Sequence, residues 1–115
     1  MTRSVSRYAA IALFILGSLA AISAGIAQRK PDPERGNELF DEQCSSCHNA
    51  ASTDRKMGPG LKLLFAKPKL ESNGKPVNEA SVLDKIEKGG NGMPPFKDTL
   101  EKDDKADLLA YLKTL

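Results

Sequence analysis

Cys44-Ser45-Ser46-Cys47-His48 is the stretch that decides the fold of this chain, because it holds both cysteines and the only histidine. On a helix, residues three and four positions apart share a face, so both thiols and the imidazole can project to one side. Two thiols at this spacing, followed at once by histidine, form the attachment site of a c-type haem. The thiols form thioethers to the haem vinyl groups and the histidine binds iron. The stretch therefore predicts one covalent haem c on Cys44, Cys47 and His48.

Three other interpretations of the two cysteines are weaker. A redox dithiol occurs in βαβ surroundings, whereas residues 32–40 before the motif have a helical pattern. A structural zinc site needs four ligands, and two cysteines and one histidine fall short unless a carboxylate joins them. A disulfide between Cys44 and Cys47 would close so short a loop that it would remove little entropy from the unfolded chain.

The composition limits the chain to one small domain. It has 115 residues, of which 40% are hydrophobic, with 17 Lys and Arg residues against 15 Asp and Glu residues. A domain of this size buries little apolar surface by itself, so we expect the haem to supply much of the core. The chain carries no nucleic-acid signature, and we expect a monomer whose partners are other redox proteins.

The first 27 residues have the layout of an export signal. Two arginines precede an uncharged run over residues 8–27, which the small residues Gly25 and Ala27 close. We therefore expect residues 1–27 to be a signal peptide cleaved after Ala27, leaving a domain over residues 28–115 in the periplasm. The alternative is an uncleaved anchor that holds the domain on the inner membrane, because about 20 apolar residues can cross a bilayer.

Three segments of the remaining chain have helical patterns, and none alternates like a strand. The first helix is expected to have Asp32 as its N-cap and Pro33 in its first position, with its apolar face leading into the cysteine motif. The second is expected between an N-cap at Asn78 and a stop at Gly89. The third is expected to begin between residues 99 and 101. Long stretches rich in glycine and proline between these segments predict loops.

The second axial ligand of the iron cannot be a histidine, because His48 is the only one. The position must be filled by a methionine or another donor, or stay vacant. Met1 lies in the export segment and Met57 follows His48 closely. Met93 lies in an irregular loop that two following prolines stiffen, and a rigid loop can hold a thioether against iron. We therefore expect His48 and Met93 to be the metal-binding residues.

Taken in order, these motifs resemble those of the small bacterial class I monohaem cytochromes c. Residues 36–48 are similar to the family's first helix and attachment site, in which a glycine and an aromatic residue pack against the final helix. Residues 108–112 are similar to that final helix, and residues 92–94 resemble the axial-methionine loop. Residues 58–61 resemble the segment whose proline carbonyl, here that of Pro59, accepts a hydrogen bond from the ligating histidine. The resemblance thus adds Pro59 to the cofactor-binding residues.

The resemblance implies an all-α class I cytochrome c fold, with three or more helices wrapped around one covalent haem. Iron held on both faces has no site for substrate, so we expect an electron carrier and not an enzyme, shuttling single electrons between respiratory or other redox partners outside the cytoplasm. One alternative is the electron-entry subunit of a larger oxidoreductase complex. Another is a ligand-binding or peroxidase-like haem protein, which needs an open sixth position and distal acid or base residues.

Two further features concern the surroundings of the haem. Tyr111 is the only tyrosine beyond the export segment, and tryptophan is absent. The aromatic donor to a haem propionate that is frequent in the family is therefore missing. The candidates to replace this donor are Asn73, Lys75 and Asn91. Residues 54–75 carry six basic side chains against two acidic ones. They are either solvated loop residues or a basic rim at the haem edge that steers acidic partners.

Overall fold

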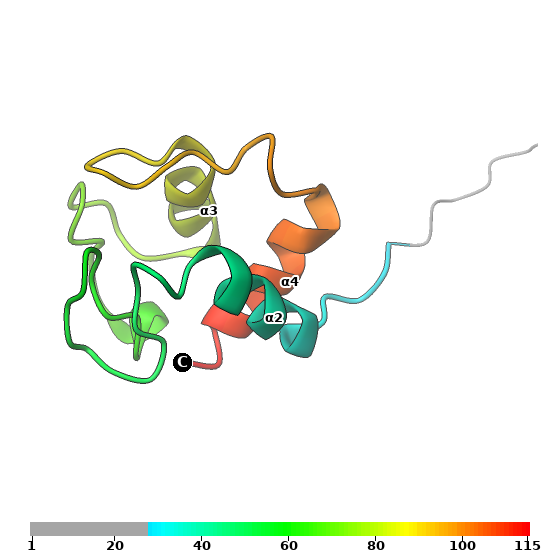
Figure 1. The fold of residues 1–115 in the computed structure, drawn as a ribbon, viewed down its shortest axis with the longest axis horizontal. Helices are drawn as coiled ribbons and strands as arrows, with labels where there is room; N and C mark the ends of the chain where they lie inside the picture. The colour runs from blue at the N-terminus through cyan, green and yellow to red at the C-terminus, as the bar shows by residue number, and fades with distance from the viewer. Residues whose placement is uncertain (1–27) are drawn as a thin grey trace, which may run out of the picture.

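The computed structural model describes residues 28–115, and the expected signal peptide or anchor lies outside the described residues. Its elements in chain order are α2 (Pro33–Gln43), the 3-10 helix η1 (Leu64–Ala66), α3 (Glu79–Lys88) and α4 (Lys102–Leu112). Figure 1 shows α2 packed across α4, while α3 and the long loops form the other side of the body. Within the described range only two isolated bridges form, so the all-α prediction is confirmed.

The predicted capping residues begin α2 and both begin and end α3. The Asp32 side chain accepts hydrogen bonds from first-turn amides, the shorter at 2.9 Å, and Pro33 opens α2. Asn78 accepts from the amide of Ser81 at 2.9 Å, and the Ser81 hydroxyl accepts from the amide of Asn78 at 3.1 Å, which closes a capping box at α3. Gly89 ends α3 with a φ of 63°, a left-handed conformation that favours glycine.

The third helix begins slightly later than expected, at Lys102. The amides of Thr99 and Leu100 both donate to the carbonyl oxygen of Phe96, at 3.2 and 3.1 Å, so these residues complete a separate turn before the helix starts. The loop predicted between the first two helices contains η1, which the glycine and proline pattern around it did not indicate. None of the helices in the described range is long and apolar enough to cross a membrane.

The crossing of α2 over α4 depends on Gly36. A Cβ atom on this residue would lie 2.1 Å from the carbonyl oxygen of Asp107, so only glycine lets the two backbones approach this closely. One turn further along, the rings of Phe40 and Tyr111 pack with centroids 5.6 Å apart and a tilt of 56°. The glycine and the aromatic residue therefore pack against the final helix, as the family resemblance implied.

A buried carboxylate ties the start of the described chain to the same crossing. Asp107 is 1% exposed and accepts hydrogen bonds from the guanidinium of Arg29 and from the amide of Asp32, both at 2.7 Å. Burial alone would raise the pKa of Asp107, but these hydrogen bonds and the positive charge of Arg29 outweigh it and leave that pKa below its usual value. The carboxylate therefore stays charged and holds residues 29–32 against α4.

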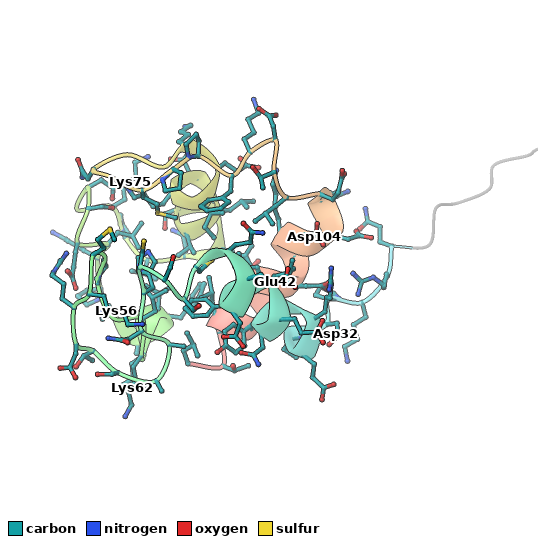
Figure 2. The ribbon with its side chains drawn as sticks, viewed as in Figure 1. Asp32, Glu42, Lys56, Lys62, Lys75 and Asp104 are labelled. Carbon is teal, nitrogen blue, oxygen red and sulfur yellow. The ribbon has the colours of Figure 1, made fainter. Side chains whose placement is uncertain are left out.

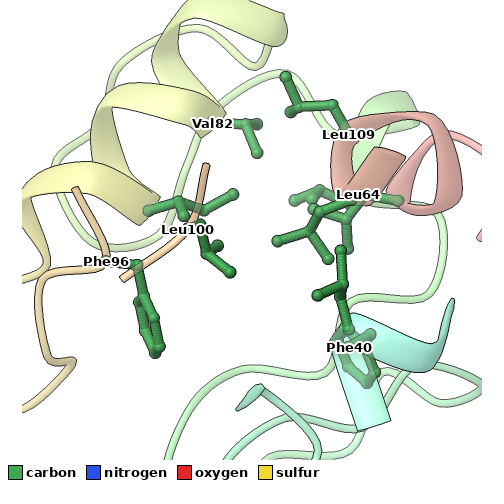
Figure 3. Close-up of a cluster of buried hydrophobic side chains, with 10 residues drawn as sticks. Phe40, Leu64, Val82, Phe96, Leu100 and Leu109 are labelled. Carbon is green, nitrogen blue, oxygen red and sulfur yellow. The ribbon is translucent and has the colours of Figure 1, made fainter. Parts of the chain in front are cut away.

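The hydrophobic core surrounds a space instead of filling the centre of the molecule. Figure 3 shows the labelled side chains in two groups that face each other across this space. The core draws on all three helices, η1 and the loop before α4, through Leu39, Phe40, Leu64, Val82, Ile86, Phe96, Leu100, Leu108, Leu109 and Leu112. Protein interiors are normally close-packed with few voids, so an open space lined by core side chains indicates room for a large apolar group.

Candidate functional site

The space in the core is a cavity of about 510 Å³. Its apolar wall includes the core side chains Phe40, Leu64, Val82, Phe96 and Leu100. The volume falls within the range of about 300–1,000 Å³ that is usual for small-molecule and cofactor sites. The predicted site residues all line this one cavity: Cys44, Cys47, His48, Pro59 and Met93.

The cysteine motif lies in a turn after α2 and not within the helix, which corrects the expected local structure. The helix ends at Gln43 because the amides of Cys44 and Ser45 both donate to the carbonyl oxygen of Phe40, at 2.8 and 2.9 Å. The next turn is closed by the amide of His48, which donates to the carbonyl oxygen of Cys44 at 3.0 Å. That bond has the i to i−4 spacing of a helix, so the three side chains still line one cavity.

The imidazole of His48 is held by a backbone carbonyl. Its Nδ1 lies 2.8 Å from the carbonyl oxygen of Pro59. Because a carbonyl can only accept a hydrogen bond, Nδ1 carries the proton, and Nε2 of the neutral ring keeps its lone pair for a metal. Gly58 packs against the ring so closely that a Cβ atom there would lie 2.4 Å from Cε1 of His48. These contacts fix both the tautomer and the position of the ring.

Met93 lies on a tight hairpin, and we call residues 89–94 the Met93 hairpin. The amide of Gly90 donates to the carbonyl oxygen of Met93 at 2.8 Å, and the amide of Met93 donates back to Gly90 at 3.2 Å. Between them, Asn91 and Gly92 have φ values of 57° and 86°, the pattern of a two-residue hairpin turn that Asn-Gly favours. A backbone hydrogen-bond pair therefore constrains this loop, in addition to the two prolines that the sequence predicted to stiffen it.

The C-terminus of α3 decides where the loop that carries this hairpin runs. The last carbonyls of a helix lack partners inside it, and here the returning chain supplies them. The amide of Phe96 donates to the carbonyl oxygen of Ile86 at 3.0 Å, and the amide of Lys97 donates to that of Glu87 at 3.3 Å. The loop thus turns back along α3 and carries Met93 to the cavity.

Met57 also lines the cavity, but it packs against the attachment turn, the turn of residues 44–48 that carries the cysteine motif. Its sulfur lies 3.9 Å from Sγ of Cys47, and the amide of the next residue, Gly58, donates to the carbonyl oxygen of Cys47 at 2.8 Å. The Met57 side chain is 81% exposed, whereas Met93 is half-buried against the core. Met57 therefore lies beside the cysteines at the surface, and Met93 reaches the cavity from a separate element.

The Cys44 thiol does not have the chemistry of an activated nucleophile. Burial, with a smaller contribution from the nearby Cys47, raises the pKa of the Cys44 thiol to about 11. A redox-active cysteine needs the opposite shift, because the thiolate is the reactive form. This shift argues against Cys44 as the attacking thiol of a dithiol, and the helix that precedes the motif argues against the dithiol interpretation as a whole.

Several charged side chains on the cavity wall were not singled out as site residues. Glu71 pairs with Arg55 at 2.7 Å and with Lys67 at 3.5 Å, and Lys69 lies on the same wall. Of the three suggested propionate donors only Asn91 lines the cavity. Lys85 lines it as well. Its place in the last turn of α3 is the only signal that the sequence gives for it, and Lys88 shares that signal.

Comparisons with known proteins agree on one family. The family model described as cytochrome C oxidase, cbb3-type, subunit III matches residues 31–112. The chain is 31% identical over 100 residues to cytochrome c6 of Synechocystis sp., which covers 87% of this chain and 78% of that protein. A solved structure of cytochrome c6 from the diatom Phaeodactylum tricornutum superposes with a TM-score of 0.56 at 26% identity, over 72% of this chain and 92% of that one.

A second group of relatives consists of larger proteins. The chain is 34% identical over 84 residues to the cytochrome bc1 complex cytochrome c subunit of Corynebacterium diphtheriae, over 72% of this chain. The matched part is 27% of that protein, so the chain spans about a quarter of the length of this relative.

Proposed function

Because the chain belongs to the cytochrome c family, with a match to its cbb3-type subunit III model, we propose that it is a haem electron carrier. One covalently bound haem c is the cofactor that this membership implies. The observation that carries the proposal is that two thiols, an imidazole and the half-buried Met93 thioether line a single, mainly apolar cavity of about 510 Å³. The residues present therefore fit the cofactor.

Each predicted site residue takes a distinct role in the proposal. Cys44 and Cys47 form the thioether bonds, while Nε2 of His48 and Sδ of Met93 are the iron ligands. Pro59 holds the His48 tautomer through the 2.8 Å contact to Nδ1. When bound, the haem supplies one-electron chemistry at iron. The protein binds and orients the group, and methionine ligation favours its ferrous form.

The cavity wall favours electron transfer over substrate chemistry. Among the described residues Glu71 is the only carboxylate on that wall, and Arg55 and Lys67 pair with it. Peroxidase-like chemistry needs a free acid or base beside an open iron position. We therefore propose that the protein is not an enzyme.

A second candidate function is that of a haem subunit inside a larger oxidoreductase complex. The relationship to a subunit of the cytochrome bc1 complex favours it. Purification of the tagged full chain from its own cells separates the two functions. A carrier elutes alone, whereas a subunit elutes with stoichiometric amounts of the other chains of its complex.

We propose that acidic redox proteins dock on the side of the molecule formed by the loops. Figure 2 shows Lys56, Lys62 and Lys75 on that side, with Asp32 and Asp104 toward the helical side. Arg55, Lys67 and Lys75 form ion pairs, whereas Lys56, Lys62 and Lys69 form none within the described range. Of these three, Lys69 lines the cavity, and Lys56 donates to the carbonyl oxygen of Ser45 in the attachment turn. Lys56 and Lys69 are thus the cations available to steer a partner to the cavity.

We propose that residues 1–27 direct export and that the domain over residues 28–115 works in the periplasm. N-terminal sequencing of the mature protein tests this directly. A periplasmic protein that begins at Gln28 supports cleavage after Ala27. A full-length band confined to the membrane fraction supports the anchor instead.

The proposed function is tested on the purified holoprotein in two steps. Extraction with acidified acetone should leave the haem on the polypeptide, and colour in the solvent would refute covalent attachment. The ferric spectrum should be low-spin with a sulfur-to-iron charge-transfer band, and it should return unchanged after repeated reduction and reoxidation. A high-spin ferric spectrum would favour a ligand-binding protein.

A further inference from the structure

Lys85 makes an unusual pair of contacts at the end of α3. Its ammonium donates to the carbonyl oxygens of Gly89 and Gly90, at 3.0 and 2.9 Å. Hydrogen bonds from a charged donor are shorter and about twice as strong as those between neutral groups. One side chain therefore fixes two successive peptide groups at the base of the Met93 hairpin.

These two peptide groups belong to glycines at the base of the hairpin. Gly89 and Gly90 have φ values of 63° and 105°, and without side chains they have more conformational freedom than any other residue pair. At the tip of the hairpin the side-chain Nδ2 of Asn91 donates to the carbonyl oxygen of Ser72, at 3.3 Å. The base is closed by the backbone pair between Gly90 and Met93 and by the helix-terminal bond from the amide of Gly89 to the carbonyl oxygen of Lys85. The two Lys85 contacts are the side-chain hydrogen bonds that support it.

Lys88, the next lysine on α3, is a solvated residue with which Lys85 can be compared. Lys88 is 74% exposed and pairs with the carboxylate of Asp84. Lys85 is half-buried, lines the cavity, and forms no ion pair with any carboxylate of the described chain. Its charge is directed at backbone carbonyls of the hairpin.

We propose that Lys85 is a positioning residue that holds the Met93 hairpin closed, so that the Met93 thioether stays at the cavity. The inference rests on the proposed role of Met93 as an axial ligand. Loss of both hydrogen bonds lets the base of the hairpin open, and the thioether then leaves its place more often. A small molecule that competes for the same position gains access in proportion to this opening.

The test compares three variants of the holoprotein. Lys85→Met keeps the aliphatic stem and removes the donors, Lys85→Arg keeps donors at this position, and Lys88→Met removes the same charge from the neighbouring exposed site. The first readout is the rate at which imidazole binds to the ferric protein. The second is hydrogen exchange at the amides of Gly90 and Met93, which reports the hairpin without using redox activity.

Lys85→Met should bind imidazole at least about tenfold faster than the wild type, since the loss of even one charge-assisted hydrogen bond corresponds to about that factor. Exchange at the two hairpin amides should rise by a similar factor. Lys85→Arg should stay within about twofold of the wild type and Lys88→Met should match it. Equal imidazole and exchange rates in Lys85→Met and Lys88→Met would overturn the proposal.

Two further outcomes keep this inference separate from the proposed function. If Met93→Ala retains the sulfur-to-iron charge-transfer band, Met93 is not the ligand, and the exchange of the hairpin amides alone decides the role of Lys85. If Lys85→Met does not assemble with haem, Lys85→Gln replaces it, because its shorter side chain cannot reach both carbonyls. Wild-type exchange rates in Lys85→Gln would then overturn the proposal.

Discussion

Replacing Gly36 by alanine tests whether the crossing of α2 over α4 sets the stability of the domain. The new Cβ would lie 2.1 Å from the carbonyl oxygen and 2.6 Å from the carbonyl carbon of Asp107, where ordinary contact begins at 3.4 Å. Both atoms belong to the backbone, so no side chain can rotate away. The two helices must instead separate by about an ångström, which also disturbs the packing of Phe40 on Tyr111.

The expected magnitude is the balance of two opposing terms. Alanine in a helix interior is favoured over glycine by about 1 kcal/mol. Overpacking costs about 1–3 kcal/mol, and a clash with backbone atoms belongs at the upper end. The net loss is therefore about 2 kcal/mol, which lowers the melting temperature of a domain of this size by roughly 8–16 °C.

Thermal unfolding of the holoprotein, followed by circular dichroism, measures this shift. Asn37→Ala is the matched control, because it lies next to Gly36 on the exposed face of α2 and should gain about 0.5 kcal/mol from helix propensity. A melting temperature of Gly36→Ala equal to that of the wild type, or above it, would refute the claim that the close crossing is required.

Two further variants, one single and one double, test the roles of charged side chains. Asp107→Asn should lower the free energy of unfolding by about 1–3 kcal/mol at neutral pH. Because the pKa of Asp107 is lowered in the folded protein, this difference should be complete above the ordinary value of 3.8 and vanish as the pH falls through the folded pKa. Thermal melts across pH measure it, and Asp103→Asn at an exposed position is the control that should show no such loss. The double variant Lys56→Glu with Lys69→Glu should slow electron transfer to an acidic partner and weaken the salt dependence of the rate, whereas Lys102→Glu on α4 should do neither. The reduction potential is measured separately. A wild-type rate that does not change with salt would contradict electrostatic steering.

The features that the sequence predicted well are those whose signal is local. Asp32 and Asn78 accept hydrogen bonds from amides two or three residues away, so their capping roles depend on nothing distant. Gly89 stops α3 because its own backbone takes a left-handed conformation. The attachment motif is equally local, and its residues meet at the cavity even though the turn that holds them begins where α2 ends.

What the sequence could not predict depends on residues far apart in the chain. Asp107 is one of several acidic residues near the C-terminus, and only its contact with Asp32, 75 positions away, distinguishes it as buried. The end of α2 at Gln43 follows from the hydrogen bond of the Ser45 amide to the carbonyl oxygen of Phe40, which the apolar periodicity does not indicate. The contacts of Lys85 became visible only when the returning loop was located against α3.

The ferric absorption spectrum of Met93→Ala, compared with that of Met57→Ala, tests the central claim most directly. If Met93 is the axial ligand, its loss abolishes the sulfur-to-iron charge-transfer band, lowers the reduction potential and lets cyanide bind readily. Met57 is 81% exposed beside Cys47, so its loss should leave all three properties unchanged. A band that survives in Met93→Ala and disappears in Met57→Ala would contradict the account.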